Sequence, residues 1–345
     1  MYKVSICGHF GGNEKYFDGQ TVKTKNIYNE LLCRYKKEEI GIVDTYNWKK
    51  HPIRLFMNCI RIMKKSKNLI ILPAHNGIKV FIPLFANLNR IYKRKVFYIV
   101  IGGWLPELLQ GKKYLIRKIK MLDKIFVETN KMKHKLVNLE INNVDILVNF
   151  KKITPLTEEK LNYDFDKPHK ICTFSRVMKE KGIEDVVEAI KQINKEADEI
   201  IYKLDIYGPI DTKYVEQFKK VEEGFPQYIQ YKGCVDSNKS IDTLKKYYLL
   251  VFPTRFKSEG IPSTIIDAFA SGTPVIASRW DNFEEVIKEG YNGFGYEFGS
   301  QKDLILKLKE CSNNERILKL KKNCILTANI YNPKKAIQKL IMELE

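Results

Sequence analysis

The segment from Ser258 to Ser278, SEGIPSTIIDAFASGTPVIAS, combines residue types that could bind both an anion and a sugar. Its two carboxylates, Glu259 and Asp267, stand eight positions apart. Proline next to hydroxyl residues predicts a helix start and Gly-Thr-Pro a stop, so a short helix is expected over 263–271. A helix N-terminus offers free N–H groups to a phosphate, and carboxylates accept hydrogen bonds from sugar hydroxyls. The alternative is a capped helix whose aspartate only complements the helix dipole.

Two basic residues that could also bind an anion occur earlier, in the segment FSRVMKEKGIEDVVEAI. Arg176 and Lys181 follow the strand pattern KICTFS and precede a helix expected to begin near Ile183. Cations at such a loop can neutralise a diphosphate leaving group, and arginine can bind it through two hydrogen bonds. Either cation alone would be an ordinary solvated surface charge.

The first 150 residues contain a second set of candidates, each placed after a strand pattern. Paired glycines in GHFGGNEKYFDG could let backbone approach a phosphate or an acceptor closely, although their spacing is not that of a dinucleotide site. The segments GQTVKTK, ILPAHNG and IGGWLPELL complete the set, for which plain loops and helix starts are the alternative. The residues predicted on this acceptor or phosphate side are Gly11, Gly12, Gln20, Lys23, His75, Gly102, Gly103 and Trp104.

Short apolar strand patterns that alternate with helical periodicity must position these residues. YKVSI, IGIVD, NLIILP, KVFYIVIGG, KIFVE and VDILV come first, and KICTFS, YKLDIYG, IQYKG, YLLVFP and TPVIAS follow a polar stretch with two prolines. Such alternation predicts an α/β fold with parallel sheets wrapped by helices. Two Rossmann-like domains facing a crevice are therefore expected, over 1–155 and 170–330, with a linker over 156–169 and a helix at 331–345 returning to the first domain.

Three segments in this order and spacing carry a family resemblance: SRVMKEKGIEDVVEAI, KSEGIPSTIIDAFASGTPVIAS and EEVIKEGYNGFGYEF. Over roughly residues 170–300 the chain resembles family-4 retaining glycosyltransferases, which have the GT-B fold. The resemblance implies that Arg176 and Lys181 bind the donor diphosphate. Glu259 would contact the donor sugar, and Asp267, which stands where the family usually has glutamate, would contact the ribose.

The resemblance also assigns backbone contacts and exposes one departure. Sugar, phosphate and base would be held around Gly260, Ile261, Ser263, Thr264, Gly208, Gly233, Cys234 and Val235. Gly102, Gly103 and Trp104 occupy the place where many family members carry a histidine near the transferred sugar. No metal and no cofactor are expected, and the Asp164-x-Asp166 pair is interpreted as part of the linker.

The excess of basic residues is concentrated in the first part of the chain. Residues 1–150 hold 28 lysines and arginines against 11 acidic residues, whereas the whole chain has a net charge of +19. RLFMNCIRIMKKSK is expected to place Leu55, Phe56, Cys59, Ile60 and Met63 on one helical face. The first half is therefore predicted to bind an anionic membrane surface. The alternative is that this segment forms an ordinary domain helix whose charged face is solvated.

The sequence thus favours a retaining, metal-independent glycosyltransferase. It would move a hexose or N-acetylhexosamine from a nucleotide diphosphate sugar, most simply a UDP-sugar, to a lipid-linked oligosaccharide in bacterial surface polysaccharide synthesis. Seven scattered cysteines, no transmembrane-length apolar run and no signal-peptide pattern predict a cytoplasmic protein, peripheral at the inner membrane face. Three alternatives remain: a GT-B sugar-nucleotide epimerase, a membrane-associated scaffold, and a polyanion-binding protein, although no nucleic-acid-binding motif is present.

Overall fold

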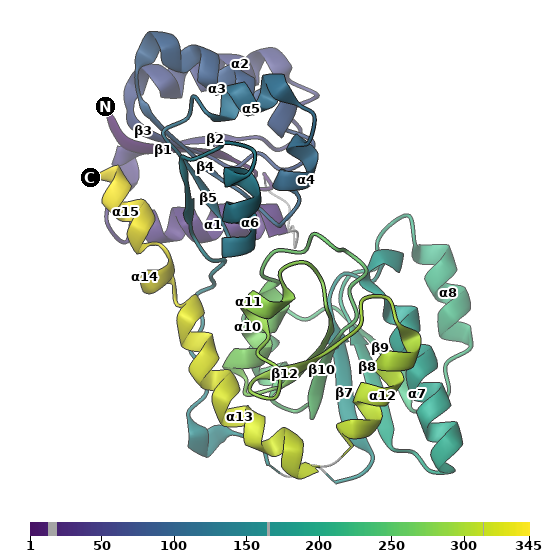
Figure 1. Ribbon diagram of the computed structural model, residues 1–345. Coiled ribbons are helices and arrows are strands. Elements are labelled where there is room, and N and C mark those ends of the chain that lie inside the picture. Colours follow the sequence, from purple (N-terminus) through teal and green to yellow (C-terminus); the bar gives the residue numbers. More distant parts are fainter. Residues whose placement is uncertain (13–18, 164–165, 313) are drawn as a thin grey trace. The chain divides into compact units, whose positions relative to one another are not determined.

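The computed structural model describes residues 1–12, 19–163, 166–312 and 314–345. The chain divides into two compact units, of which the first comprises Met1–Lys152 with Tyr331–Glu345 and the second comprises Ile153–Ile330 (Figure 1). Because the chain enters the second unit once and leaves it once, the first unit is built from two separate stretches of sequence.

The first unit contains a six-stranded parallel sheet in the described residues, with strand order β2-β1-β3-β4-β5-β6. Its strands are short and mostly buried, as expected for a sheet covered by helices on both faces. Their bounds are β1 Tyr2–Gly8, β2 Ile40–Asp44, β3 Ser66–Ile71, β4 Lys95–Ile99, β5 Lys124–Val127 and β6 Val144–Ile146.

Helices cover both faces of this sheet, because right-handed crossovers in opposite directions lie on opposite faces. The two cores under them differ in size. The larger core lies under five helices, α2 Pro52–Lys65, α3 Ile78–Tyr92, α4 Leu105–Leu109, α5 Lys113–Ile119 and α6 Asn130–Val137. The other core lies under α1 Gly19–Leu32, α14 Pro333–Ala336 and α15 Gln338–Leu344. A short 3-10 turn, Lys37–Glu39, precedes β2.

The C-terminal stretch completes the core of the first unit. Ile337, Leu340 and Leu344 are buried against the sheet, together with residues of α1. The Asn68 side chain donates to the Leu344 carbonyl at 2.8 Å, so polar contacts also fix the last turn.

The second unit contains another six-stranded parallel sheet in the described residues, with order β12-β11-β10-β7-β8-β9. Its strands are β7 His169–Phe174, β8 Tyr202–Tyr207, β9 Ile229–Gly233, β10 Leu249–Phe252, β11 Val275–Ser278 and β12 Gly293–Tyr296. β12 is not among the strands predicted from the sequence, because its residues, GFGY, lack the β-branched apolar run that marks the other strands.

Helices of the second unit pack in two groups. One group joins α7 Ile183–Ala197 to α12 Gln301–Glu310, and the other places α10 Ser263–Ala270 against α9 Ser240–Leu244 and α13 Asn314–Ala328. The remaining helical segments are α8 Val215–Glu223, α11 Phe283–Val286 and the 3-10 turns Glu158–Lys160, Lys179–Lys181 and Asn329–Tyr331.

One predicted helix face is wrong in part. On α2 the buried side chains are Leu55, Cys59, Ile62 and Met63, whereas Phe56 is 45% exposed. At 100° per residue, the buried residues span an arc of about 100°, and Phe56 falls at its edge. No helix among the described residues is long and apolar enough to cross a bilayer.

Candidate active site

The strand order of the second unit reverses between β7 and β10, which are hydrogen-bonded neighbours. In open α/β sheets, the loops that leave the carboxyl ends of such strands form the ligand crevice. The loop after β7 carries Arg176 and Lys181, and the loop after β10 carries Glu259. The fold therefore brings both halves of the predicted donor site to one edge of the sheet.

Lys181 and Glu259 contact each other directly. The Lys181 ammonium donates to the Glu259 carboxylate, and both side chains are largely buried, 16% and 18% exposed. Thr254 also donates to the same carboxylate oxygen at 3.2 Å, and the ammonium lies 5.3 Å from the centre of the Phe252 ring. The cation and the carboxylate are therefore held next to each other, partly shielded from water.

Backbone contacts between loops fix this pair. The Glu259 carbonyl accepts from the Asn282 side chain at 2.6 Å, which ties the loop to the segment after β11. On the other side, Gly182 has a φ of 66°, and a Cβ there would lie 2.1 Å from the Pro253 carbonyl oxygen. Only glycine allows the loops after β7 and β10 to approach this closely.

Arg176 is held more loosely than Lys181. Its guanidinium lies 3.7 Å from the Asp211 carboxylate, and its side chain is 44% exposed. A single parallel bridge between Val177 and Ile210 holds the backbone here. Such an exposed ion pair is weak, so Arg176 is free to exchange Asp211 for an anionic ligand.

The N-terminus of α10 supplies a further binding element. Pro262 occupies the N-cap position, and helix geometry leaves the first N–H groups without intrahelical partners. The Thr264 hydroxyl oxygen is buried and has no hydrogen-bond partner in the structure. An unpartnered hydroxyl at a helix N-terminus fits an oxygen-rich ligand such as phosphate. Gly260, Ile261 and Ser263 lie in the same segment, and Asp267, one turn inside α10, is only 4% exposed.

The loops predicted to surround the base also meet at this edge. The Gly208 N–H donates to the Gly233 carbonyl at 2.9 Å, and the Tyr231 hydroxyl donates to the Gly208 carbonyl at 2.8 Å. A Cβ at Gly208 would lie 1.9 Å from the Ser175 carbonyl oxygen, so this glycine permits close packing beside the Arg176 loop. Cys234 is exposed and Val235 is half-buried.

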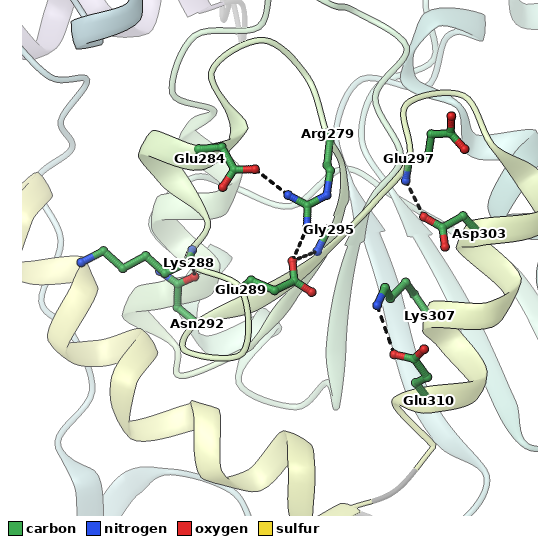
Figure 2. Close-up of polar contacts among 10 residues, drawn as sticks. All are labelled: Arg279, Glu284, Lys288, Glu289, Asn292, Gly295, Glu297, Asp303, Lys307 and Glu310. Carbon is green, nitrogen blue, oxygen red and sulfur yellow. Dashed lines mark hydrogen bonds and ion pairs between the residues drawn. The ribbon is translucent and has the colours of Figure 1, made fainter.

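The third segment of the resemblance, EEVIKEGYNGFGYEF, fastens the loop after β11 to β12. Figure 2 shows Arg279 between two carboxylates, Glu284 at 2.5 Å and Glu289 at 2.7 Å, while Glu289 also accepts from the Gly295 N–H at 2.9 Å. Asn292, fully buried, accepts from the Lys288 N–H at 2.9 Å. These contacts are structural, and they hold the segment between β11 and β12 in place.

Replacing Asn292 with alanine is expected to lower the free energy of unfolding by about 1–3 kcal/mol, because the Lys288 N–H loses its acceptor. Urea titration followed by circular dichroism measures this change. Asn323→Ala, on α13, changes a half-buried asparagine and is expected to lower the free energy of unfolding less. An unchanged midpoint for Asn292→Ala would contradict the structural role.

In the first unit, the switch point lies between β1 and β3. Two side chains of α1 reach backbone carbonyls beyond the strand ends. Gln20 donates to the Leu72 carbonyl at 2.8 Å, and Lys23 donates to the Val100 carbonyl at 3.1 Å and to the Glu128 carboxylate at 2.5 Å. Lys23 is 3% exposed. Both predicted residues thus brace the loops after β3 and β4.

The glycine loop after β1 is organised by a carboxylate. Asp44 accepts from the Phe10 N–H at 2.9 Å, from the Gly12 N–H at 3.0 Å and from the Tyr46 N–H at 2.8 Å. Gly11 and Gly12 have φ values of 85° and 56°, which favour glycine. The rest of the segment, residues 13–18, lies outside the described residues.

His75 and Trp104 lie together on the adjoining loops. Their ring centres are 5.2 Å apart in an edge-to-face arrangement, and the Trp104 indole donates to the Ile101 carbonyl at 2.6 Å. Gly102 has a φ of 75°, and Gly103 is the residue between it and the indole. The exposed imidazole and the half-buried indole therefore form one polar and aromatic surface.

Four residues of these sites were missed from the sequence: Asp44, Glu128, Asp211 and Thr254. Asp44, Glu128 and Asp211 act through partners that are distant in the chain, and Thr254 acts on Glu259, five residues away in a loop, so periodicity marks none of them. The only signal is a polar residue at or just beyond a strand end, which Asp44, Glu128 and Thr254 share. Within the described ranges, no group of three or more His, Cys, Asp or Glu residues could hold a metal ion, and Asp164 of the Asp-x-Asp pair is not among them.

Comparisons with known proteins identify the family of the chain. Residues 157–331 match the family of glycosyl transferases group 1. An uncharacterised glycosyltransferase of Methanocaldococcus jannaschii is 26% identical over 239 residues, which is 68% of this chain and 58% of that protein. CapM, a capsular polysaccharide biosynthesis glycosyltransferase of Staphylococcus aureus, is 24% identical over 66% of this chain and 63% of its own length. The chain thus spans less than two thirds of these two relatives.

Among solved structures, HepE of Anabaena in complex with UDP and glucose is similar in fold. It is 12% identical, with a TM-score of 0.76, and the match covers 100% of this chain and 99% of HepE. The predicted α/β fold with two Rossmann-like domains of the GT-B type is thereby confirmed.

Proposed function

Because the chain belongs to the family of glycosyl transferases group 1, we propose that it transfers a hexose or N-acetylhexosamine from a nucleotide diphosphate sugar, with retention of configuration. The observation that carries the proposal is the contact of Lys181 with Glu259 at the switch point, beside the N-terminus of α10. A diphosphate is bound by cations and N–H groups, and a sugar by carboxylates, and this edge of the sheet has groups of all three kinds.

Each part of the donor has its own binding residues in this proposal. Arg176, Lys181 and the first turn of α10 neutralise the charge that develops on the leaving diphosphate. Glu259 accepts hydrogen bonds from the donor sugar, and Asp267 is the candidate for the ribose. Electrostatic stabilisation by these groups lets the reaction proceed without a metal ion, as we propose for this chain.

The bond changes are those of a same-face substitution. The bond between the sugar C1 and the diphosphate oxygen breaks, an acceptor oxygen forms a bond to C1 from the same face, and the acceptor proton passes to the leaving phosphate. Lys181 faces the negative charge that builds up on the diphosphate oxygen while its bond to C1 breaks and before the acceptor proton reaches it, which favours departure of the nucleoside diphosphate. No protein nucleophile is required.

A uridine nucleotide is the proposed donor, supported by HepE, whose structure holds UDP and glucose. The proposed acceptor is a lipid-linked saccharide at the inner face of a bacterial cell membrane. Support comes from CapM, which acts in capsular polysaccharide biosynthesis, and from the excess of basic residues in the first 150 positions.

Calorimetric titration with UDP, GDP and ADP in the presence of EDTA tests the donor site. One nucleotide is expected to bind without a divalent metal, and Arg176→Ala/Lys181→Ala is expected to abolish its binding, because both cations face the diphosphate. Failure of all three nucleotides to bind would overturn the proposal. Binding that survives in the double variant would overturn the assignment of the two cations.

A further inference from the structure

The first turns of α2, α3 and α5 expose apolar side chains among lysines and arginines. On α2, Ile53 is 79% exposed and Met57 is 59% exposed, although both belong to a helix whose opposite face is in the core. Val80 on α3 is 43% exposed and Tyr114 on α5 is 54% exposed. Large apolar side chains that are exposed together usually mark an interaction surface.

Contacts in the structure place these helix starts together. Trp48, just before α2, contacts Phe81 of α3 with ring centres 5.7 Å apart. A groove of about 500 Å³ is walled by Lys79 of α3 and by Lys112, Lys113 and Tyr114 at the start of α5. Figure 1 shows α2, α3 and α5 together on the same side of the sheet.

The charge around this surface is almost all positive. Residues 45–120 contain seventeen lysines and arginines and one acidic residue, Glu107. On α2, Arg54, Arg61 and Lys64 are exposed on the side of Ile53 and Met57. The Arg117 and Lys118 cations lie 5.8 and 5.5 Å from the centre of the Tyr114 ring. Exposed apolar tips ringed by cations complement an interface that has anionic head groups outside and hydrocarbon inside.

We infer that the first turns of α2, α3 and α5 form a docking surface for an anionic lipid bilayer. The apolar side chains of Ile53 and Met57 enter the head-group region, and the lysine groove around Tyr114 binds lipid phosphates. The inference deepens the proposed function, on which it rests for the lipid-linked acceptor. His75 lies three residues before α3, so the surface adjoins the acceptor candidates of the same unit.

The helix α3 offers a matched comparison. Lys79 and Val80 stand at its start, and Arg90 and Ile91, also exposed, stand at its end. Ile91 is 74% exposed, more than Val80. A general attraction of basic and apolar residues to lipid would involve both ends, whereas the proposed surface involves only the first.

Co-sedimentation of the full chain with vesicles tests the inference. We expect binding to vesicles of phosphatidylcholine with phosphatidylglycerol, and little binding to phosphatidylcholine alone. Ile53→Ser/Met57→Ser is expected to lower the partition coefficient about tenfold or more, because two apolar side chains no longer enter the head-group region. Lys79→Ala/Lys112→Ala/Lys113→Ala is expected to lower it about tenfold or more, because each cation near the surface contributes about fivefold. Arg90→Ser/Ile91→Ser is expected to bind as the unaltered chain does.

Absence of binding to the anionic vesicles would overturn the inference, as would an equal loss in the Arg90→Ser/Ile91→Ser variant. Tighter binding to double-stranded DNA than to vesicles at the same salt concentration would also overturn it, in favour of a soluble polyanion. All substituted side chains are exposed, and circular dichroism verifies that each variant is folded. Nucleotide titration of the same preparations is a separate readout: a chain that binds vesicles but no nucleotide supports this surface and contradicts the proposed function.

Discussion

Replacing Lys181 with alanine is expected to lower kcat/KM for sugar transfer about 100- to 1,000-fold, the usual loss when one preorganised donor to a developing negative charge is removed. The Lys181 ammonium contacts the Glu259 carboxylate, which also accepts a hydrogen bond from Thr254. The cation is therefore positioned before any ligand binds. Because the negative charge on the diphosphate is greatest in the transition state, kcat should fall more than the affinity for donor. Initial rates over a range of donor concentrations separate the two effects.

Lys179→Ala is the matched control for this variant. Lys179 lies on the same 3-10 turn, two residues earlier, and is exposed. It carries the same charge in the same neighbourhood, but the contact that the structure records with Glu259 is made by Lys181. Equal losses in the two variants would show that Lys181 acts only through the general positive potential, and would contradict a specific role.

Replacing Lys23 with methionine is expected to lower the free energy of unfolding by about 3–5 kcal/mol, since breaking a buried ion pair leaves an uncompensated charge inside the protein. Both side chains of the pair with Glu128 are 4% exposed. Methionine fills a similar volume, so the loss arises from the ammonium and not from a cavity. Equilibrium unfolding in urea, followed by circular dichroism, measures it.

Two further variants sharpen this test. Lys25→Met changes an exposed lysine two residues along the same helix and should shift the free energy of unfolding by about 0.5 kcal/mol or less. Lys23→Met/Glu128→Gln should be less destabilised than the sum of its single variants, because the second change removes the isolated charge. Additive losses would contradict direct coupling between the two side chains.

Much of the fold follows from local pattern. The helix expected over 263–271 extends from Ser263 to Ala270, because proline and hydroxyl residues mark its start and glycine marks its end. The helix expected near Ile183 begins at that residue. The alternation of buried strands with helices predicted two parallel sheets, and in the second of them Lys181 and Glu259, 78 residues apart in the chain, lie at the same edge.

Other features depend on tertiary partners and could not be read from the chain. Gln20 and Lys23 were predicted on the acceptor or phosphate side, but the carbonyls beyond strands of other segments to which they donate could not be inferred from the sequence. Asp44 accepts hydrogen bonds from three N–H groups in two loops, and no spacing of residues predicts these bonds. The assignment of Phe56 to the core face of α2 failed because an amphipathic pattern does not mark where burial ends.

Because Tyr331–Glu345 belongs to the first unit, the two units are completed in a fixed order during synthesis. The ribosome completes Ile153–Ile330, with its own sheet and core, before the residues that cover the α1 side of the first sheet have been made. Until Ile337, Leu340 and Leu344 emerge, the apolar side chains they bury remain accessible to water and to other chains. The N-terminal unit is thus the last to mature, which reverses the usual order of co-translational folding.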